Sequence, residues 1–357
     1  MDKNNFIFRR SGHSVNCEYW NNLSDEAKEV FAQQIFDEYR TDDNGIPYNP
    51  KSLGYPYYPT DHEYRVKEFE KLKSFDFSTV LTTGDTIRQT MHGLGLAWSY
   101  FPHASEVECA NMMSPLNAFC SDLIFKKIIH KRLKMGTYIS DSGIRKMIKV
   151  YTGVQGVSNF RPTAAAAIYK EFAPNGVVWD PSGGWGGRML GAIIAGVDTY
   201  VTTEPAALTV KGLKELAEDF AGDMKYEIIQ SGSEDYDPEP DRFDLCFTSP
   251  PYFNLERYSD EDSQSYKKFS NKQLWIDGFL ASTLKNCYKG TKQGKLTLIN
   301  MADPKGKNGL NLEDEIIRVA KLVGFKYEGM LKLALSNPTM KNKLSPFKFE
   351  PVFIFRK

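Results

Sequence analysis

The segment Phe243–Tyr258, FDLCFTSPPYFNLERY, contains the residue types and spacing best suited to chemistry. Its apolar beginning predicts a buried strand that ends at Thr248, and this strand is followed directly by Ser249, Pro250, Pro251 and Tyr252. Two consecutive prolines stiffen the backbone and remove two N–H donors. The carbonyls around them and the serine hydroxyl then form a fixed set of acceptors, and the tyrosine adds a flat face for stacking. Such a set suits a planar base that has an exocyclic amino group.

A second candidate segment is VVWDPSGGWGGRMLGA, residues 177–192. It predicts a strand that ends in Asp180 and Pro181, a turn rich in glycine, and a helix that begins at once. The turn contains Gly183, Gly184, Gly186 and Gly187. Glycines let a backbone approach a ligand closely, and the carboxyl end of a first sheet strand is where such folds bind ligands. The pattern alone would serve NAD, another nucleotide or S-adenosylmethionine (SAM), or a tight turn that binds nothing.

Glu204 is the third candidate, at the end of the next predicted strand, 24 residues after Asp180. This distance is close to the ~20 residues at which an acid contacts ribose hydroxyls in dinucleotide-binding folds. The alternative is a solvated carboxylate at a strand end.

Short apolar runs alternate with helical patterns in the second half of the chain, and this alternation predicts a mostly parallel, doubly wound α/β sheet. The expected strands are 177–179, 199–203, 226–230, 243–247, 295–300, 327–333 and 352–355. The helices expected between them are 187–195, 208–220, 272–288 and 312–323. We place a domain boundary near residue 157, with an α-rich domain over 1–157 that includes helices at 24–40, 62–75 and 115–135.

Taken together, Asp180-Pro181-x-x-Gly184-x-Gly186 and the later Thr248–Tyr252 resemble the motifs of the amino-group DNA methyltransferases, SAM-dependent enzymes that modify cytosine N4 or adenine N6. The resemblance covers roughly residues 158–357. The chain end KFEPVFIFRK is similar to the last strand of that family, and SNFRPTAAAAIYKEFAP is similar to its motif X helix. One departure is DPSGGWGGR, where the family usually has DPFxGSGTT.

The resemblance implies a Rossmann-like SAM-dependent methyltransferase domain over 158–357, with SAM as cofactor, no metal and no covalent intermediate. It implies that Asp180, Pro181 and the glycine loop hold the methionine part of SAM, and that Glu204 binds the ribose. Ser233 and Glu234 are placed to meet the adenine, and Phe160 to pack on the cofactor. Ser249 and the Pro250 carbonyl would accept hydrogen bonds from the target amine, while Tyr252 stacks on a base flipped out of double-stranded DNA.

Cytosine N4 is the favoured acceptor, because serine before Pro-Pro-Tyr occurs mostly in the cytosine-N4 members of the family. Adenine N6 is the alternative within the same chemistry. Two further alternatives are an RNA base methyltransferase and an inactive SAM-fold module that binds nucleic acid. The sequence does not indicate whether a restriction nuclease accompanies the enzyme.

Composition limits how DNA could be bound. The 357 residues include 45 lysines and arginines and 45 aspartates and glutamates, so any nucleic-acid contact requires a local basic surface. The stretch 126–149 contains eight basic residues and one acid, and phosphate contacts are predicted for Lys126, Lys127, Lys131, Arg132 and Lys134. The alternative is a solvated helix face.

Other sequence features indicate the compartment. No apolar run approaches the 18 residues that a membrane span requires, and the first residues lack the apolar core of a signal peptide. The five cysteines form no CxxC pair, and the five histidines have no metal-ligand spacing. We therefore expect a cytoplasmic protein without a disulfide framework.

Overall fold

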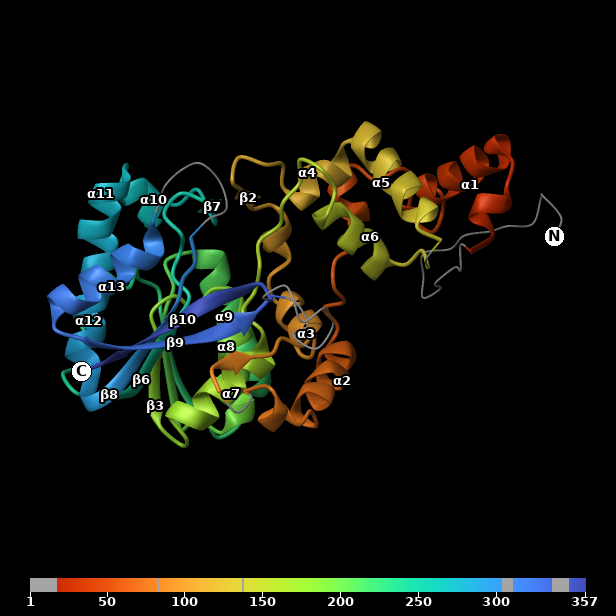
Figure 1. Cartoon of the computed structure of the whole chain (residues 1–357). Coiled ribbons are helices and arrows are strands. Elements are labelled where there is room, and N and C mark those ends of the chain that lie inside the picture. The colour runs from red at the N-terminus through yellow and green to blue at the C-terminus, as the bar shows by residue number, and fades with distance from the viewer. Residues whose placement is uncertain (1–17, 82–83, 137, 304–310, 336–346) are drawn as a thin grey trace. The chain divides into compact units, whose positions relative to one another are not determined.

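The computed structural model describes residues 18–81, 84–136, 138–303, 311–335 and 347–357 (Figure 1). The chain forms two compact units. The first consists of Met1–Tyr57 and His103–Val157, and the second of Tyr58–Pro102 and Ser158–Lys357.

The structure divides the chain differently from the expected 1–157 and 158–357, because Tyr58–Pro102 belongs with the second unit. Aromatic packing holds this segment there, since Phe69 stacks on Phe220 with ring centroids 4.3 Å apart. Strand β1, Thr86–Ile87, also pairs with strand β9 of the large sheet. Sequence patterns did not indicate either contact, because both join positions far apart in the chain.

The first unit is mostly helical, as the sequence indicates. Its elements are η1 (Glu18–Asn22), α1 (Asp25–Glu38), η2 (Lys51–Gly54), β2 (Glu108–Cys109), α4 (Pro115–Cys120), α5 (Asp122–Lys134) and α6 (Asp141–Lys149). The expected helix 115–135 is two helices, because the backbone of Ser121 is extended and interrupts the hydrogen bonding. Phe119 and Phe125, one on each side of this break, pack together in the core with ring centroids 4.5 Å apart.

The second unit is built on an eight-stranded sheet of order β1-β9-β10-β8-β6-β3-β4-β5. Its strands are β3 (Val177–Asp180), β4 (Thr199–Thr203), β5 (Lys225–Ile229), β6 (Phe243–Thr248), β8 (Thr291–Asn300), β9 (Lys326–Ala334) and β10 (Phe349–Arg356), together with β1. All neighbours are parallel except β10, which runs antiparallel to β8 and β9. The predicted doubly wound α/β sheet is thereby confirmed, and all seven expected strands are present. The strand order reverses between β3 and β6, and open α/β sheets bind ligands at that point.

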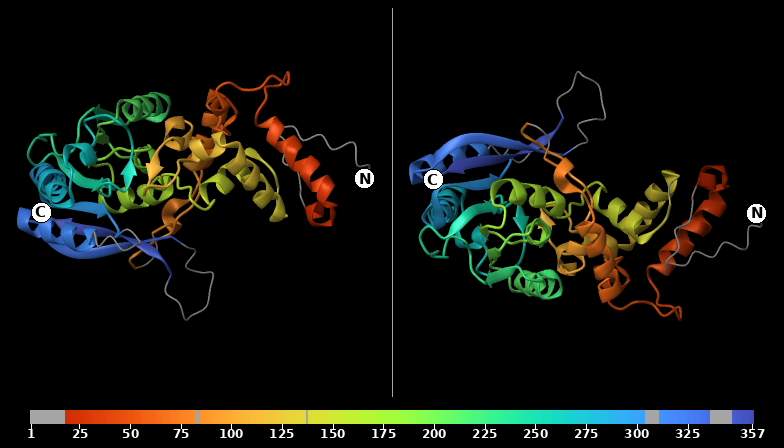
Figure 2. Two further views of the ribbon diagram at one scale, coloured as in Figure 1. Left: turned by 90° about the horizontal axis from the view of Figure 1, so that it is seen from above. Right: turned by 90° about the horizontal axis from the view of Figure 1, so that it is seen from below.

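Helices cover both faces of this sheet (Figures 1 and 2). One layer contains α7 (Pro162–Phe172), α8 (Gly187–Ala195) and α9 (Ala207–Phe220), and the opposite layer contains α12 (Ala281–Gly290) and α13 (Leu312–Val323). The remaining elements are α2 (His62–Lys73), η3 (Phe77–Thr79), α3 (Leu94–Trp98), η4 (Pro102–Ser105), β7 (Glu256–Arg257), α10 (Ser265–Lys268) and α11 (Lys272–Leu274). The expected helix 272–288 contains a π-helical turn, Trp275–Leu280, before α12. Within the described ranges, no helix is both long and apolar enough to cross a membrane.

Candidate functional site

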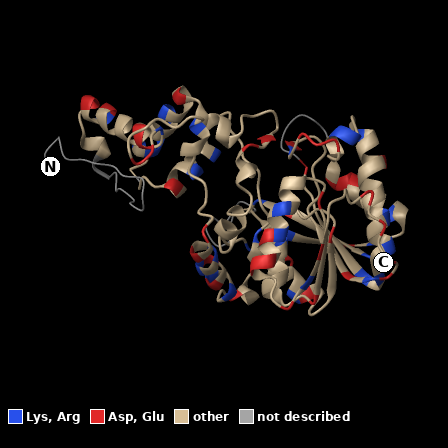
Figure 3. Ribbon diagram, turned by 180° about the vertical axis from the view of Figure 1, so that it is seen from behind, with Lys and Arg blue, Asp and Glu red and all other residues tan. Residues whose placement is uncertain are grey.

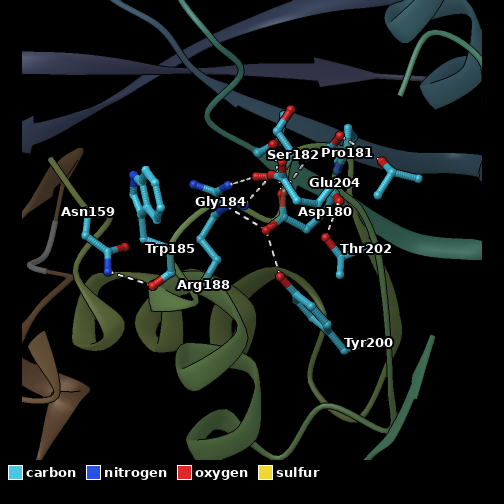
Figure 4. Close-up of polar contacts among 12 residues, drawn as sticks. Asn159, Asp180, Pro181, Ser182, Gly184, Trp185, Arg188, Tyr200, Thr202 and Glu204 are labelled. Carbon is cyan, nitrogen blue, oxygen red and sulfur yellow. Dashed lines mark hydrogen bonds and ion pairs between the residues drawn. The ribbon is translucent and has the colours of Figure 1, made fainter. Parts of the chain in front are cut away.

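Asp180, the last residue of β3, is fully buried and is the centre of a polar network (Figure 4). One carboxylate oxygen accepts from Arg188 Nε at 2.8 Å and from the Tyr200 hydroxyl at 2.7 Å. The other accepts from Thr248 Oγ1 at 2.8 Å and from the Ser182 amide at 3.2 Å. A carboxylate has about four acceptor positions, and all are used here. In this structure Asp180 therefore holds the loop and the neighbouring strands, and it offers no open acceptor to the methionine part expected beside it.

Arg188 forms a buried ion pair with Asp180, and their side chains are 6% and 0% exposed. Burial opposes the charge of the guanidinium, but Asp180 beside it raises the pKa of Arg188 above its ordinary value. Arg188 Nη2 also donates to the carbonyl of Ser182. Loss of one partner of a buried pair strands the other charge, at a cost of about 3–5 kcal/mol. Sequence reasoning noticed Arg188 only as a departure from the family pattern.

The glycine loop after β3 is held against the next strand. The amide of Gly183 donates to Thr203 O at 3.0 Å, and Thr203 Oγ1 donates to Pro181 O at 2.8 Å. Gly184 and Gly186 have φ angles of +53° and +71°, a conformation that residues with a Cβ rarely adopt. The turn therefore requires glycine at both positions, and helix α8 begins immediately after it.

Glu204 follows β4 and faces this loop. Its carboxylate accepts from the amide of Gly184 at 3.1 Å and from that of Ala206 at 3.0 Å, and the residue is 8% exposed. Burial raises the pKa of Glu204 to about 7, although the two amide bonds oppose this shift. Each oxygen keeps one acceptor position, so the carboxylate can still accept from a pair of hydroxyls.

Ser233 and Glu234 follow β5, and their side chains differ in availability. The Ser233 hydroxyl is bonded to Thr283 Oγ1 at 2.8 Å, so this side chain is engaged with α12. One oxygen of Glu234 pairs with Lys268 Nζ at 2.6 Å. The other, Oε2, is buried and has no hydrogen-bond partner within the described part of the chain. Of the two residues expected near the adenine, Glu234 is thus the one with an open acceptor.

The Thr248–Tyr252 segment lies at the end of β6, next to β3 in the sheet. The hydrogen bond from Thr248 to Asp180 ties it to the glycine loop. Burial raises the pKa of the Tyr252 hydroxyl, and the nearby carboxylates of Glu350 and Glu256 act in the same direction. Phe253 then adopts a φ of +55°, uncommon for a residue with a bulky side chain and a strain that often accompanies functional loops.

Phe160, which precedes α7, and Trp185, within the glycine loop, are the large aromatic residues of this region. The ring of Phe160 packs edge-on against Phe247 at 5.2 Å, and the guanidinium carbon of Arg188 lies 5.9 Å from the Phe160 centroid. Asn159 Nδ2 donates to the carbonyl of Trp185 at 2.8 Å. Trp185 is nearly buried and contacts Trp98, with centroids 6.0 Å apart. A large residue fits in this loop because Tyr58–Pro102 packs with the second unit and supplies Trp98.

A strap, defined as residues 259–269, contacts segments that follow β4 and β5. The carboxylate of Glu261 accepts from the amide of Ala207 at 3.0 Å, and Ser263 Oγ donates to Pro205 O at 3.4 Å. Lys268 reaches Glu234, as described above. The sequence patterns did not indicate these contacts.

Figure 3 shows blue Lys and Arg segments and red Asp and Glu segments on the helices of the first unit. The five basic residues predicted to bind phosphates lie on α5; two of them are hydrogen-bonded within the first unit, and Lys131 Nζ lies 5.5 Å from the centroid of the Tyr151 ring. Lys126 Nζ donates to Gln33 at 2.9 Å, and Arg132 Nη2 donates to Tyr138 O at 2.7 Å. Lys127, Lys131 and Lys134 are exposed and make no ion pair with any described residue. These three form the basic cluster considered below.

No protein-family model and no curated protein matches the sequence. Similar solved structures include the 1,6-didemethyltoxoflavin-N1-methyltransferase of Burkholderia thailandensis with bound S-adenosylhomocysteine, at 13% identity and a TM-score of 0.36, covering 54% of this chain and 76% of that one. A TehB-like SAM-dependent methyltransferase of Corynebacterium glutamicum is 17% identical, with a TM-score of 0.34 and coverage of 56% and 89%. TYW2 of Pyrococcus horikoshii in complex with MeSAdo is 15% identical, with a TM-score of 0.36 and coverage of 58% and 69%. Sequence identities and TM-scores as low as these do not show what this chain does.

Proposed function

We propose that this chain is a SAM-dependent methyltransferase that transfers a methyl group to the exocyclic amine of a flipped DNA base, with cytosine N4 favoured over adenine N6. The observation that carries the proposal is the hydrogen bond of 2.8 Å between Thr248 and Asp180. It fixes the glycine loop beside the Ser-Pro-Pro-Tyr segment at the point where the strand order reverses. A cofactor loop and a base-binding loop are thereby held next to each other.

The residues present fit SAM at this edge of the sheet. Glu204 has acceptor positions left for the two ribose hydroxyls, and the buried, unpartnered Glu234 Oε2 can accept from an amino group. A Cβ built on Gly184 would meet no atom closer than 3.7 Å, so this side of the loop is not sterically blocked. Glu204, Glu234 and the glycine loop would hold SAM, which supplies an activated methyl group when bound.

The chain's own residues would position the base and its amine. The Ser249 hydroxyl and the Pro250 carbonyl would accept hydrogen bonds from the NH₂ group. These bonds would draw the nitrogen toward tetrahedral geometry and free its lone pair for attack on the methyl carbon. The amine nitrogen would gain the methyl group as the carbon–sulfur bond breaks, with S-adenosylhomocysteine as the leaving group, and would then release one proton to water. Tyr252 would offer its ring to the base for stacking. Catalysis here would consist of positioning and preorganised electrostatics.

DNA is the proposed polymer, and the exposed Lys127, Lys131 and Lys134 support a phosphate contact outside the catalytic unit.

The direct test incubates the protein with labelled SAM and either double-stranded DNA or RNA of mixed sequence, in separate reactions. Mass spectrometry then identifies the modified base. We expect N4-methylcytosine in DNA. N6-methyladenine would correct the acceptor, and label in RNA alone would correct the polymer. SAM binding without transfer to either polymer would identify an inactive module and overturn the proposal.

A further inference from the structure

The guanidinium of Arg188 has an edge that the protein does not use. Nε donates to Asp180 and Nη2 donates to the Ser182 carbonyl, while Nη1 makes no hydrogen bond within the described residues. A guanidinium has five N–H donors in a fixed planar fork. The side chain is nine-tenths buried, but Nη1 itself is not completely enclosed by protein atoms. Arg188 is therefore a buried cation with donors to spare and an open side.

This open side lies inside the proposed cofactor site. Figure 4 shows the guanidinium beside Gly184 and the turn from Asp180 to Ser182, and a Cβ on Gly184 would lie 3.9 Å from Arg188 Nη2. The Phe160 ring lies near the guanidinium, 5.9 Å from its carbon. Asp180 and the glycine loop were expected at the methionine part of SAM and Phe160 on the cofactor, and the methionine part ends in a carboxylate and an ammonium group.

The charges at this position suit the carboxylate. Asp180 is saturated, so it accepts nothing more, and its negative charge is offset by Arg188 at 2.8 Å. The guanidinium still offers N–H groups in one plane, and arginine binds carboxylates through two parallel hydrogen bonds.

We infer that Arg188 binds the α-carboxylate of the methionine part of SAM, so that a charged side chain takes a role in this loop that sequence reasoning assigned to Asp180 and the glycines. The inference rests on the proposed function and adds a specificity-determining residue to it. It assigns Arg188 two contacts at once, a structural one with Asp180 and a ligand-binding one through its open edge.

The test compares SAM with decarboxylated SAM, which lacks only the carboxylate, by calorimetric titration of the wild-type chain. A charge-assisted bond to a carboxylate predicts that SAM binds roughly ten- to a hundredfold more tightly. Affinities that agree within about threefold would overturn the inference and leave SAM binding intact. If the chain bound neither compound, the proposed function would fail together with the inference.

Variants then assign the preference to Arg188. Because Arg188→Met alone leaves a buried charge on Asp180, the decisive variant is Arg188→Met combined with Asp180→Asn, which leaves neither charge unpaired. We expect it to lose the preference for SAM over decarboxylated SAM while its affinity for the latter changes less than about threefold. The matched control is Arg242→Met, which removes a surface arginine paired with Glu227 and should keep the wild-type ratio. Retention of the preference by the double variant would overturn the inference, and the wild-type comparison stands without any variant.

Discussion

Ser249 is the residue on which the proposed transfer depends most directly, because its hydroxyl would contact the amine at the reacting atom. We expect Ser249→Ala to slow methyl transfer by roughly 10²–10³, by analogy with the removal of one preorganised donor from an oxyanion hole. SAM affinity should not change. Single-turnover transfer of labelled methyl to DNA measures the effect, and calorimetry provides the parallel binding value.

Tyr252→Phe is the matched variant in the same segment. It keeps the ring for stacking and loses only the hydroxyl, so it should keep much of the activity. Tyr252→Ala should lose more, since stacking of a base on an aromatic ring contributes roughly 1–3 kcal/mol. Wild-type rates in both Ser249→Ala and Tyr252→Ala would reduce Thr248–Tyr252 to a rigid turn.

The raised pKa of Glu204 predicts that cofactor binding depends on pH. Its pKa is raised by burial to about 7, and only the ionised carboxylate can accept from both ribose hydroxyls. If binding requires that form, SAM affinity should rise about tenfold from pH 6 to pH 8 and level off above that. Glu204→Gln should bind weakly with a flat profile, and calorimetry at a series of pH values tests both statements.

The same carboxyl also makes the free energy of unfolding depend on pH, in the direction opposite to that of SAM affinity. A carboxyl whose pKa rises on folding from 4.5 to about 7 binds more protons in the native state over that interval. Its contribution to the free energy of unfolding therefore falls as pH rises between those values. Glu204→Gln should be more stable than the wild type at pH 8, and denaturant unfolding would show it. An equal or lower stability of the variant at that pH would contradict the assignment.

At the scale of elements, α7 and α8 pack closely because Gly191 has no side chain. A Cβ at Gly191 would lie 2.5 Å from the Cβ of Ala165 and 2.8 Å from the backbone of Ala166. We expect Gly191→Ala to lower the free energy of unfolding by about 1–3 kcal/mol through overpacking. Gly196→Asn is the control, since that glycine has open space around it and asparagine tolerates its φ of +73°. Denaturant unfolding should separate the two variants clearly.

The strap over residues 259–269 depends on Lys268, which pairs with Glu234 at 2.6 Å. Removal of Lys268 leaves the nearly buried Glu234 carboxylate without its charged partner. We expect Lys268→Ala to loosen the strap and to increase proteolytic cleavage within it, while the thermal unfolding of the chain changes little. Lys272→Ala is the nearby control, because the Lys272 side chain lies outside the strap and makes no ion pair with any residue that the structure describes. Equal cleavage in the two variants would show that the ion pair does not hold the strap.

At the scale of the whole molecule, the first unit presents the basic cluster Lys127, Lys131 and Lys134. We expect the change of all three to glutamate to weaken DNA binding and to flatten its dependence on salt, because fewer counterions are released. SAM affinity should not change. Reversal of Lys170 and Lys214, on the helices α7 and α9, is the control, and fluorescence titration with duplex DNA at several salt concentrations is the measurement. Unchanged DNA affinity at every salt concentration would identify the cluster as a solvated helix face.

The sequence determined the parts of this protein that depend on local patterns. Apolar runs, helical periodicity and turn residues indicated seven strands of the sheet around the site, namely β3, β4, β5, β6, β8, β9 and β10. The Gly-rich and Pro-Pro-Tyr segments indicated where ligands would bind. These features are encoded within short windows, because strand and helix propensity and turn chemistry act between near neighbours.

Only the tertiary structure decided which side chains in those windows are open to a ligand. Asp180 is an acid at a strand end in the sequence, but Arg188, Tyr200, Thr248 and the Ser182 amide together saturate it. Likewise Lys126 and Arg132 count as basic in any window, yet partners in the fold engage them. The physical reason is that hydrogen bonds and burial are settled by residues brought together from distant positions, and a sequence read in short windows contains no record of those encounters.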